Sequence, residues 1–132
     1  SDLVLRKLRE GLLALNDSEN GNPVVRSVYL AHEIYNGEYV MQAPDVVVGF
    51  HPGYRVSWQT ALGGIPQTII EPNNRKWSGD HCSMDPEITP GVLFCNRKLA
   101  ERELSLLDVA PSVLQALGCE VPTVMEGNAW WK

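Results

Sequence analysis

The chain has 132 residues, 44% of them hydrophobic, and a formal net charge of −5. That apolar content excludes a disordered chain, and the lack of a basic excess argues against a partner that is a nucleic-acid polymer. No apolar run approaches the roughly 20 residues that span a bilayer, so no membrane association is expected. Three cysteines are too few for a disulfide scaffold. The length fits a single domain over residues 1–132.

The first fifty residues read as alternating helices and strands. Residues 2–16 carry leucines on one face and predict an amphipathic helix. Residues 24–30 are rich in β-branched and aromatic side chains and predict a strand, and 32–39 predict a short helical turn. The apolar run 45–50 predicts a buried strand, of the kind found in a sheet that is covered on both faces.

The middle of the chain differs in composition. Residues 51–90 hold five of the nine prolines and predict long ordered loops, because Trp58 and Trp77 favour packing over disorder. A short strand is expected at 68–71.

The last forty residues return to the earlier pattern. Residues 91–96 predict a second buried strand. A helix follows, with Asp108 at its N-cap, Pro111 in its first turn and Gly118 just beyond its end. Strands that alternate with helices predict an α/β fold.

Three groups with metal-binding chemistry stand in consecutive positions within the loop region. Asp80, His81 and Cys82 supply a carboxylate, an imidazole and a thiol. Imidazole is the commonest protein ligand for metals, and an adjacent carboxylate can bind the metal or orient the ring. A lone Asp-His pair is a weak signal, and the surrounding motifs decide how much weight it carries.

Those motifs resemble the C-terminal part of one family. Gly-Tyr-Arg-Val-Ser-Trp at 53–58 and Trp-Ser-Gly-Asp-His at 77–81 are similar to the type I phosphodiesterase/nucleotide pyrophosphatase branch of the alkaline phosphatase superfamily. Pro-Gly-Val-Leu-Phe at 90–94 and Asp-Val-Ala-Pro-Ser-Val-Leu at 108–114 are shared more loosely with sulfatases and cofactor-independent phosphoglycerate mutases. The resemblance covers residues 24–127.

The resemblance implies a metal-dependent phosphoric ester hydrolase with two divalent metals, usually zinc, held by Asp and His side chains. His81 matches the last metal ligand of the family, and Asp80 stands beside it. The family's Ser-Asp-His-Gly pair fits this position less well, because Cys82 replaces the glycine. The chain offers no Asp-x-x-x-His pair and no convincing Thr or Ser nucleophile, so the resemblance implies the C-terminal portion of a larger enzyme, inactive by itself. Its expected partner is the upstream half of the same enzyme.

The same resemblance implies a fold and a substrate class. The fold would be part of a three-layer α/β sheet with flanking helices and a long ordered loop region. The substrate would be a small phosphorylated molecule. Arg55 and Tyr54 could line its pocket, since guanidinium groups bind phosphate and aromatic rings stack on bases. His51 begins the loop after a buried strand, where α/β folds place their sites.

Two other functions remain open on the sequence. One is a sulfatase-like or phosphomutase-like enzyme of the same superfamily. The other is a noncatalytic α/β interaction module whose loop region 51–90 binds a partner. An exposed strand edge would also favour self-association of the chain. The sequence predicts no cellular compartment.

Overall fold

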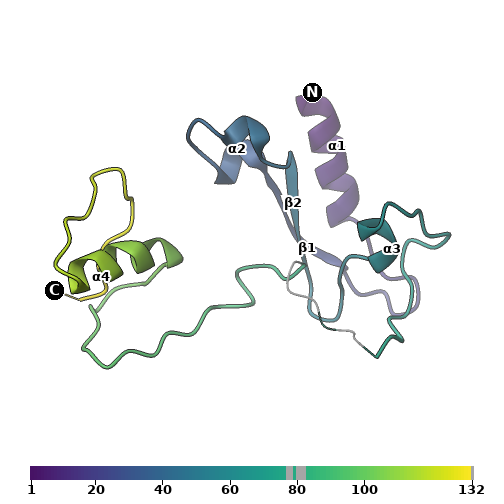
Figure 1. Ribbon diagram of the computed structural model, residues 1–132. Helices are drawn as coiled ribbons and strands as arrows, with labels where there is room; N and C mark the ends of the chain where they lie inside the picture. The colour runs from purple at the N-terminus through teal and green to yellow at the C-terminus, as the bar shows by residue number, and fades with distance from the viewer. Residues whose placement is uncertain (77–78, 80–82, 132) are drawn as a thin grey trace. The chain divides into compact units, whose positions relative to one another are not determined.

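The computed structural model describes residues 1–76, 79 and 83–131, and Figure 1 shows their helices and strands along the chain. The chain divides into two compact units, Ser1–Pro90 and Gly91–Lys132. No helix in the described part of the chain combines the length and the apolar character that crossing a membrane requires.

The first unit contains a helix, a strand pair and three short helical segments. In chain order they are α1 (Asp2–Leu13), β1 (Val25–Leu30), α2 (Ala31–Ile34), η1 (Val40–Gln42), β2 (Val46–Phe50) and α3 (Trp58–Ala61). The α/β class is confirmed, as are the two strands expected at 24–30 and 45–50. The expected helix over 2–16 ends at Leu13, where the chain turns toward β1.

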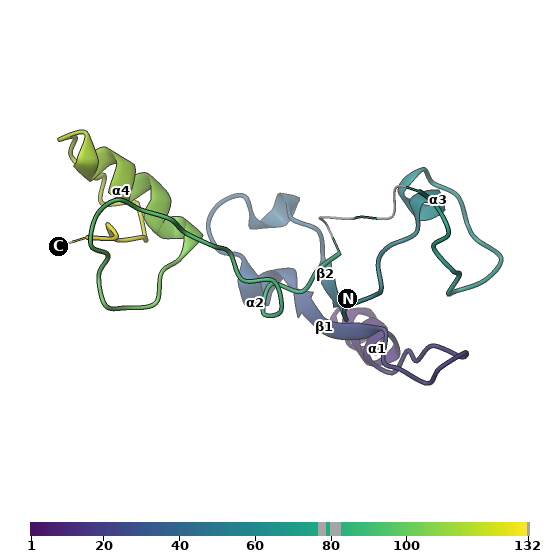
Figure 2. The ribbon, with the colours of Figure 1, turned by 90° about the horizontal axis from the view of Figure 1, so that it is seen from below.

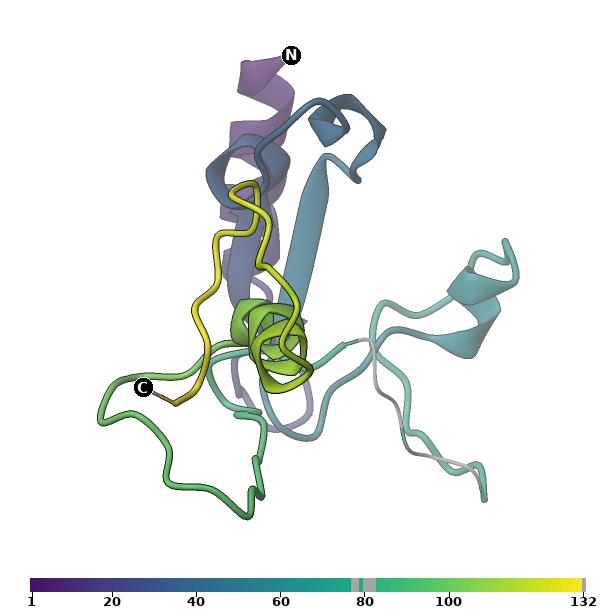
Figure 3. The same ribbon diagram turned by 60° about the vertical axis from the view of Figure 1, so that its left-hand side comes forward.

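The two strands form an antiparallel sheet. Val28 lies opposite Val48 and Leu30 opposite Val46, with a bulge between Val25 and Ser27. Helix α1 packs along β1, as Figure 3 shows. The core lies between them: Val24, Val25 and Val28 are buried, and they contact Leu12, Leu15, Val46, Val48, Phe50, Tyr54 and Ile70.

Strand β2 is less buried than its sequence predicts. Val46, Val47 and Val48 are half-buried, and Gly49 is the buried position of the strand. The sequence predicts a sheet covered on both faces, but within the described residues the sheet has two strands, and α1 is the long helix of this unit. The valines therefore keep part of their surface exposed.

A buried carboxylate anchors the chain beneath β2. Phe50 pairs in parallel with Met84, and the Phe50 N–H donates to the carbonyl oxygen of Ser83 at 2.9 Å. Asp85 follows, with 0% of its surface exposed. Its side chain lies directly against Gly49, because a Cβ at that glycine would overlap Asp85 Oδ2.

Replacing Gly49 with alanine is expected to lower the free energy of unfolding by about 1–3 kcal/mol, because the added methyl overlaps the buried Asp85 carboxylate. Gly11→Ala is the matched control. Gly11 lies inside α1, and a Cβ at this position would meet nothing within 4 Å, so this substitution should raise stability by about 0.5–1 kcal/mol. Urea denaturation of both variants checks the pair. Equal effects of the two substitutions would contradict the packing of Asp85 on Gly49.

The second unit is built on one helix. The short η2 (Leu106–Asp108) leads into α4 (Val109–Ala116), where the sequence predicts the helix. Pro111 lies in the first turn, as expected, where its missing N–H costs least. Gly118 has a φ of +71°, and the Cys119 N–H donates to the Leu114 carbonyl oxygen at 2.9 Å. This is the Schellman termination that a glycine at this position permits.

The Asp108 carboxylate organises this unit. It accepts hydrogen bonds from Arg102 Nη1 at 2.8 Å and from the backbone N–H groups of Ser105 at 2.9 Å and Asn128 at 2.8 Å. These bonds lower the pKa of the Asp108 carboxyl to about 2, with the Arg102 bond as the largest cause. The Asp108 side chain therefore holds Ser105 and Asn128 together. The sequence predicts that it caps the following helix instead, but it makes no side-chain cap bond to α4.

Two expected strands, 68–71 and 91–96, are not formed, so those predictions are wrong. Figure 2 draws 91–96 as coil in the green part of the chain. A strand needs a partner edge to bond its N–H and C=O groups. None of the described residues makes a backbone hydrogen bond to 91–95. At 68–71 the chain is held by side chains instead, because Ile70 packs on the core and Glu71 contacts α3.

Candidate functional site

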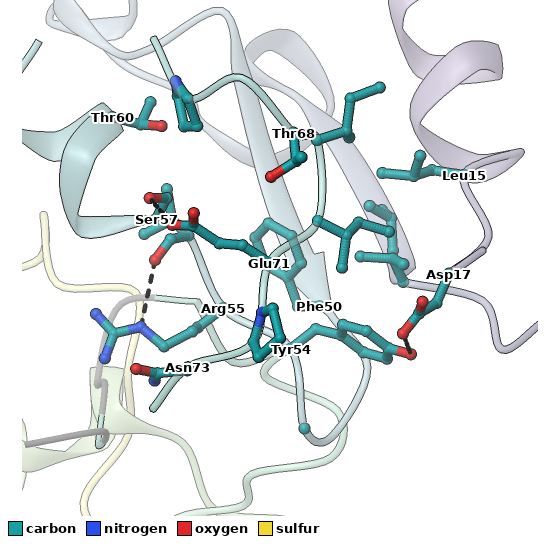
Figure 4. Close-up of a pocket in the computed structure, with 18 of the residues that line it drawn as sticks. Leu15, Asp17, Phe50, Tyr54, Arg55, Ser57, Thr60, Thr68, Glu71 and Asn73 are labelled. Carbon is teal, nitrogen blue, oxygen red and sulfur yellow. Dashed lines mark hydrogen bonds between the residues drawn. The ribbon is translucent and has the colours of Figure 1, made fainter. Parts of the chain in front are cut away.

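A cavity of about 850 Å³ opens in the first unit. Its walls come from the end of α1 and the loop after it, from the segment that follows β2, and from the loop 66–75, as Figure 4 shows. Leu15, Phe50 and Ile70 belong both to this wall and to the hydrophobic core. This apolar part of the cavity wall is therefore also part of the hydrophobic core.

Tyr54 is fixed at one side of the cavity. Its hydroxyl donates to Asp17 Oδ2 at 2.9 Å (Figure 4). Asn20 Nδ2 donates to the same oxygen at 3.0 Å. The backbone N–H of Glu19 donates to Asp17 Oδ1 at 2.9 Å. The bond from Glu19, followed by those from Tyr54 and Asn20, outweighs burial and lowers the pKa of Asp17. An ionised Asp17 thus orients the Tyr54 phenol.

Arg55 is fixed at the other side. Its guanidinium lies over the Trp58 ring, 4.7 Å from the ring centroid. Nη1 donates to the carbonyl oxygen of Gly79 at 2.8 Å, and Nε donates to the carbonyl oxygen of Val56 at 3.2 Å. Stacking on the Trp58 ring and these two hydrogen bonds together restrict the guanidinium. A cation is therefore held in a defined orientation beside the cavity.

Glu71 ties the loop 66–75 to α3. It accepts hydrogen bonds from Ser57 Oγ at 3.3 Å and from Gln59 Nε2 at 3.1 Å. Ser57 also accepts the Gln59 N–H at 3.2 Å as the N-cap of α3. Ser57, Gln59 and Glu71 thus line the cavity with polar groups.

Two described residues, Gly79 and Ser83, flank the segment that carries the expected metal ligand. On one flank, the Gly79 carbonyl oxygen accepts the bond from Arg55. On the other, Ser83 is buried, its carbonyl oxygen accepts the Phe50 N–H, and its Oγ accepts the Val56 N–H at 3.0 Å. Asp80 and His81 themselves lie outside the residues that the structure describes, as does Cys82. Of the described residues, Ser83 therefore lies beside Phe50, the last residue of β2.

The structure thus brings together two of the three expected substrate-binding residues. Tyr54 and Arg55 line the cavity, whereas His51 does not. His51 is half-buried, and its backbone N–H donates to the Val24 carbonyl oxygen at 3.0 Å. The hydrogen bond from His51 to Val24 extends the pairing of β1 and β2 by one residue, and this pairing determines where His51 lies.

Sequence reasoning missed three polar residues of the cavity wall: Asp17, Asn20 and Glu71. The stretch around Asp17 reads as a polar turn, and its composition gives no sign that the carboxylate is buried against Tyr54. An Asx turn at Asp17 could have been anticipated, since Asp in a loop often accepts the N–H two residues later. The residues described include no group of three His, Cys, Asp or Glu side chains able to hold a metal ion.

Comparisons with known proteins give a partial match. The chain is 36% identical over 70 residues to a 2,3-bisphosphoglycerate-independent phosphoglycerate mutase from Onchocerca volvulus. It is 31% identical over 70 residues to the protein of the same name from Brugia malayi. Each match covers 52% of this chain and 14% of the relative. No protein-family model matches the chain, and no solved structure matches it.

This similarity supports the coarser part of the resemblance seen in the sequence. Such mutases are members of the alkaline phosphatase superfamily, so the matches support a similarity to that superfamily. They do not support the phosphodiesterase branch in particular. Among the interpretations of the sequence, the phosphomutase-like alternative agrees with them better than the phosphodiesterase does.

Proposed function

We propose that this chain is the C-terminal portion of a metal-dependent phosphoryl-transfer enzyme of the phosphomutase type. The observation that carries the proposal is the 36% identity to a phosphoglycerate mutase over 70 residues. Because those residues are 14% of the relative, the proposal assigns most of the enzyme to polypeptide outside this chain.

Arg55 is the proposed phosphate-binding residue. Its guanidinium is stacked on Trp58 and borders the cavity, so its orientation does not have to be established when the substrate binds. A planar guanidinium can donate two parallel hydrogen bonds to phosphate oxygens. Tyr54 is proposed to shape the adjacent wall, since its hydroxyl is already engaged with Asp17.

His81 is the proposed metal ligand, with Asp80 beside it. The described residues do not form a metal site among themselves. The proposal assigns the other ligands to polypeptide outside this chain. Divalent metals bound there would supply positive charge that stabilises the transferring phosphoryl group.

A second candidate function is a phosphodiesterase of the same superfamily. The specific observation in its favour is the pair of motifs Gly-Tyr-Arg-Val-Ser-Trp at 53–58 and Trp-Ser-Gly-Asp-His at 77–81. Arg55 lies within the first motif, and its bond to Gly79 connects it to the second. Zinc is the metal that this candidate implies.

One assay separates the two candidates. The longest natural polypeptide that contains this sequence is purified and supplied with 3-phosphoglycerate, and separately with a nitrophenyl ester of a nucleoside monophosphate. Interconversion of 3- and 2-phosphoglycerate is expected. Turnover of the diester alone would replace the first candidate with the second. Turnover of neither by a polypeptide that binds divalent metal would contradict both.

Substituting Arg55 with alanine is expected to raise KM for the accepted substrate roughly 10-fold or more, because one charged hydrogen bond to phosphate is lost. Arg6→Ala serves as the matched control, since Arg6 is exposed on α1 and away from the cavity. Steady-state kinetics of both variants measure the difference. An Arg55 variant with the KM of the control would remove Arg55 from the substrate site.

A further inference from the structure

The segment 91–95 is apolar, and no strand that pairs with it lies in the described part of the chain. Val92 is 86% exposed and Phe94 is 93% exposed, although the sequence Gly-Val-Leu-Phe-Cys is typical of a buried strand. Among the described residues, none makes a backbone hydrogen bond to this segment. Its N–H and C=O groups are therefore available to an added strand.

Helix α4 presents a second apolar surface in the same unit. Its polar Ser112 faces inward, with 0% of its surface exposed, and holds the tail by accepting the Trp130 N–H at 2.9 Å. The apolar stripe stays open instead. Its members recur every three or four residues along η2 and α4, and they are Leu106, Val109, Val113 and Leu117, exposed by 88%, 38%, 49% and 72%.

This arrangement inverts the usual pattern of a globular unit, in which a helix turns its apolar stripe toward the core. The interior of the unit is held by the polar contacts of Asp108 and Ser112. The apolar stripe is exposed, whereas Pro111 is buried and Leu114 is half-buried. Exposed apolar surface of this extent marks a docking surface, because leaving it in water is unfavourable.

We infer that segment 91–95 and the α4 stripe dock onto the remainder of a longer polypeptide, where 91–95 pairs with an edge strand of a sheet. The inference rests on the proposed function in one respect, that this chain is a portion of a larger enzyme. The length of the relatives identifies the occupant, since the matched residues are 14% of each and the rest is long enough to supply a sheet. Strand addition gives main-chain hydrogen bonds, and alternate side chains provide specificity.

Hydrogen–deuterium exchange tests the inference without any activity measurement. The 132-residue chain is compared with the longest natural polypeptide that contains it. The amides of residues 92–95 are expected to exchange fast in the short chain and at least roughly 100-fold more slowly in the long one, as opening of paired strands requires. Fast exchange in both polypeptides would overturn the inference, and so would a gene that encodes these 132 residues alone.

A concentration-dependent slowing of exchange in the short chain would assign the surface to a second copy and would also overturn the inference. The experiment distinguishes failure of the docking inference from failure of the proposed function. A long polypeptide that is inactive but has protected amides at 92–95 would contradict the proposed function and still support docking.

A pair of substitutions matched in exposure adds an independent readout. Phe94 and Met41 are both 93% exposed. Phe94→Glu is expected to lower the Tm of the long polypeptide by roughly 5 °C or more, because it places a charge in an interface. Met41→Glu should leave Tm within about 1 °C, as surface substitutions do. Equal Tm shifts for the two variants would contradict the docking of Phe94.

Discussion

Replacing Asp85 with alanine is expected to lower the free energy of unfolding by about 3 kcal/mol or more. Asp85 is fully buried and accepts hydrogen bonds from the Tyr29 hydroxyl at 3.2 Å and the Glu87 backbone N–H at 2.9 Å. Arg26 Nε lies 3.4 Å from its Oδ1. Alanine would leave these donors without their common acceptor beneath β2. Urea denaturation followed by far-UV circular dichroism measures the loss.

Asp85 is ionised in the folded chain, so its negative charge contributes to stability in addition to its packing. Burial acts to raise the pKa of this carboxyl, but the bonds from Ser27, the Glu87 N–H and Tyr29, together with the charge of Arg26, outweigh burial and lower the pKa. Asp85→Asn should therefore fall between wild type and Asp85→Ala.

The control for Asp85 is Asp45→Ala. Asp45 is exposed, and its substitution should change stability by no more than about 0.5 kcal/mol. Equal losses for Asp85→Ala and Asp45→Ala would show that the carboxylate does not anchor the segment that follows Ser83.

Acid is expected to release the tail of the second unit between about pH 4 and pH 2. The folded pKa of Asp108 is about 2, against an ordinary value of 3.8. Because the folded pKa is depressed, the stabilisation is fully present above the ordinary value and is lost as the pH falls through the folded pKa. Protonation weakens the bonds from Arg102 and the Asn128 N–H, which hold the tail to the start of α4.

NMR titration of the Asn128 amide checks this prediction, with an expected midpoint near 2. In the Asp108→Asn variant the amide shift should lose this titration step, because the ionising group is gone. A wild-type midpoint at the ordinary value of 3.8 would show that Arg102 and the two backbone donors do not bind the carboxylate in solution.

The elements that depend on local pattern could be predicted from the sequence. The strands expected at 24–30 and 45–50 form as Val25–Leu30 and Val46–Phe50, because these residues are β-branched and apolar and can pair with each other. Helix α4 begins after Asp108 and ends at Ala116, because proline fits its first turn and Gly118 fits the position just beyond its C-cap. The strand expected at 91–96 has the same local pattern, but strand formation also depends on a partner, and the described residues provide none.

The candidate site was predictable in its residue types more than in its contacts. The chemistry of Arg55 and Tyr54 predicts a place at a pocket, and both line the cavity. The pairing of Tyr54 with Asp17 joins positions 37 residues apart, and no local pattern predicts such a contact. The place of His51 after β2 also predicts a site residue, but its backbone extends the strand pairing and it does not line the cavity.

Metal analysis of a His81→Ala variant tests the central proposal most directly. It is made in the longest natural polypeptide that contains this sequence, with His32→Ala as the control, since His32 is exposed on α2. We predict that His81→Ala binds less divalent metal than wild type and loses turnover roughly 100-fold or more, because even residues that only orient metal ligands contribute about 10–100-fold. The control should keep both properties. A His81→Ala enzyme with the metal content and turnover of wild type would contradict the proposal.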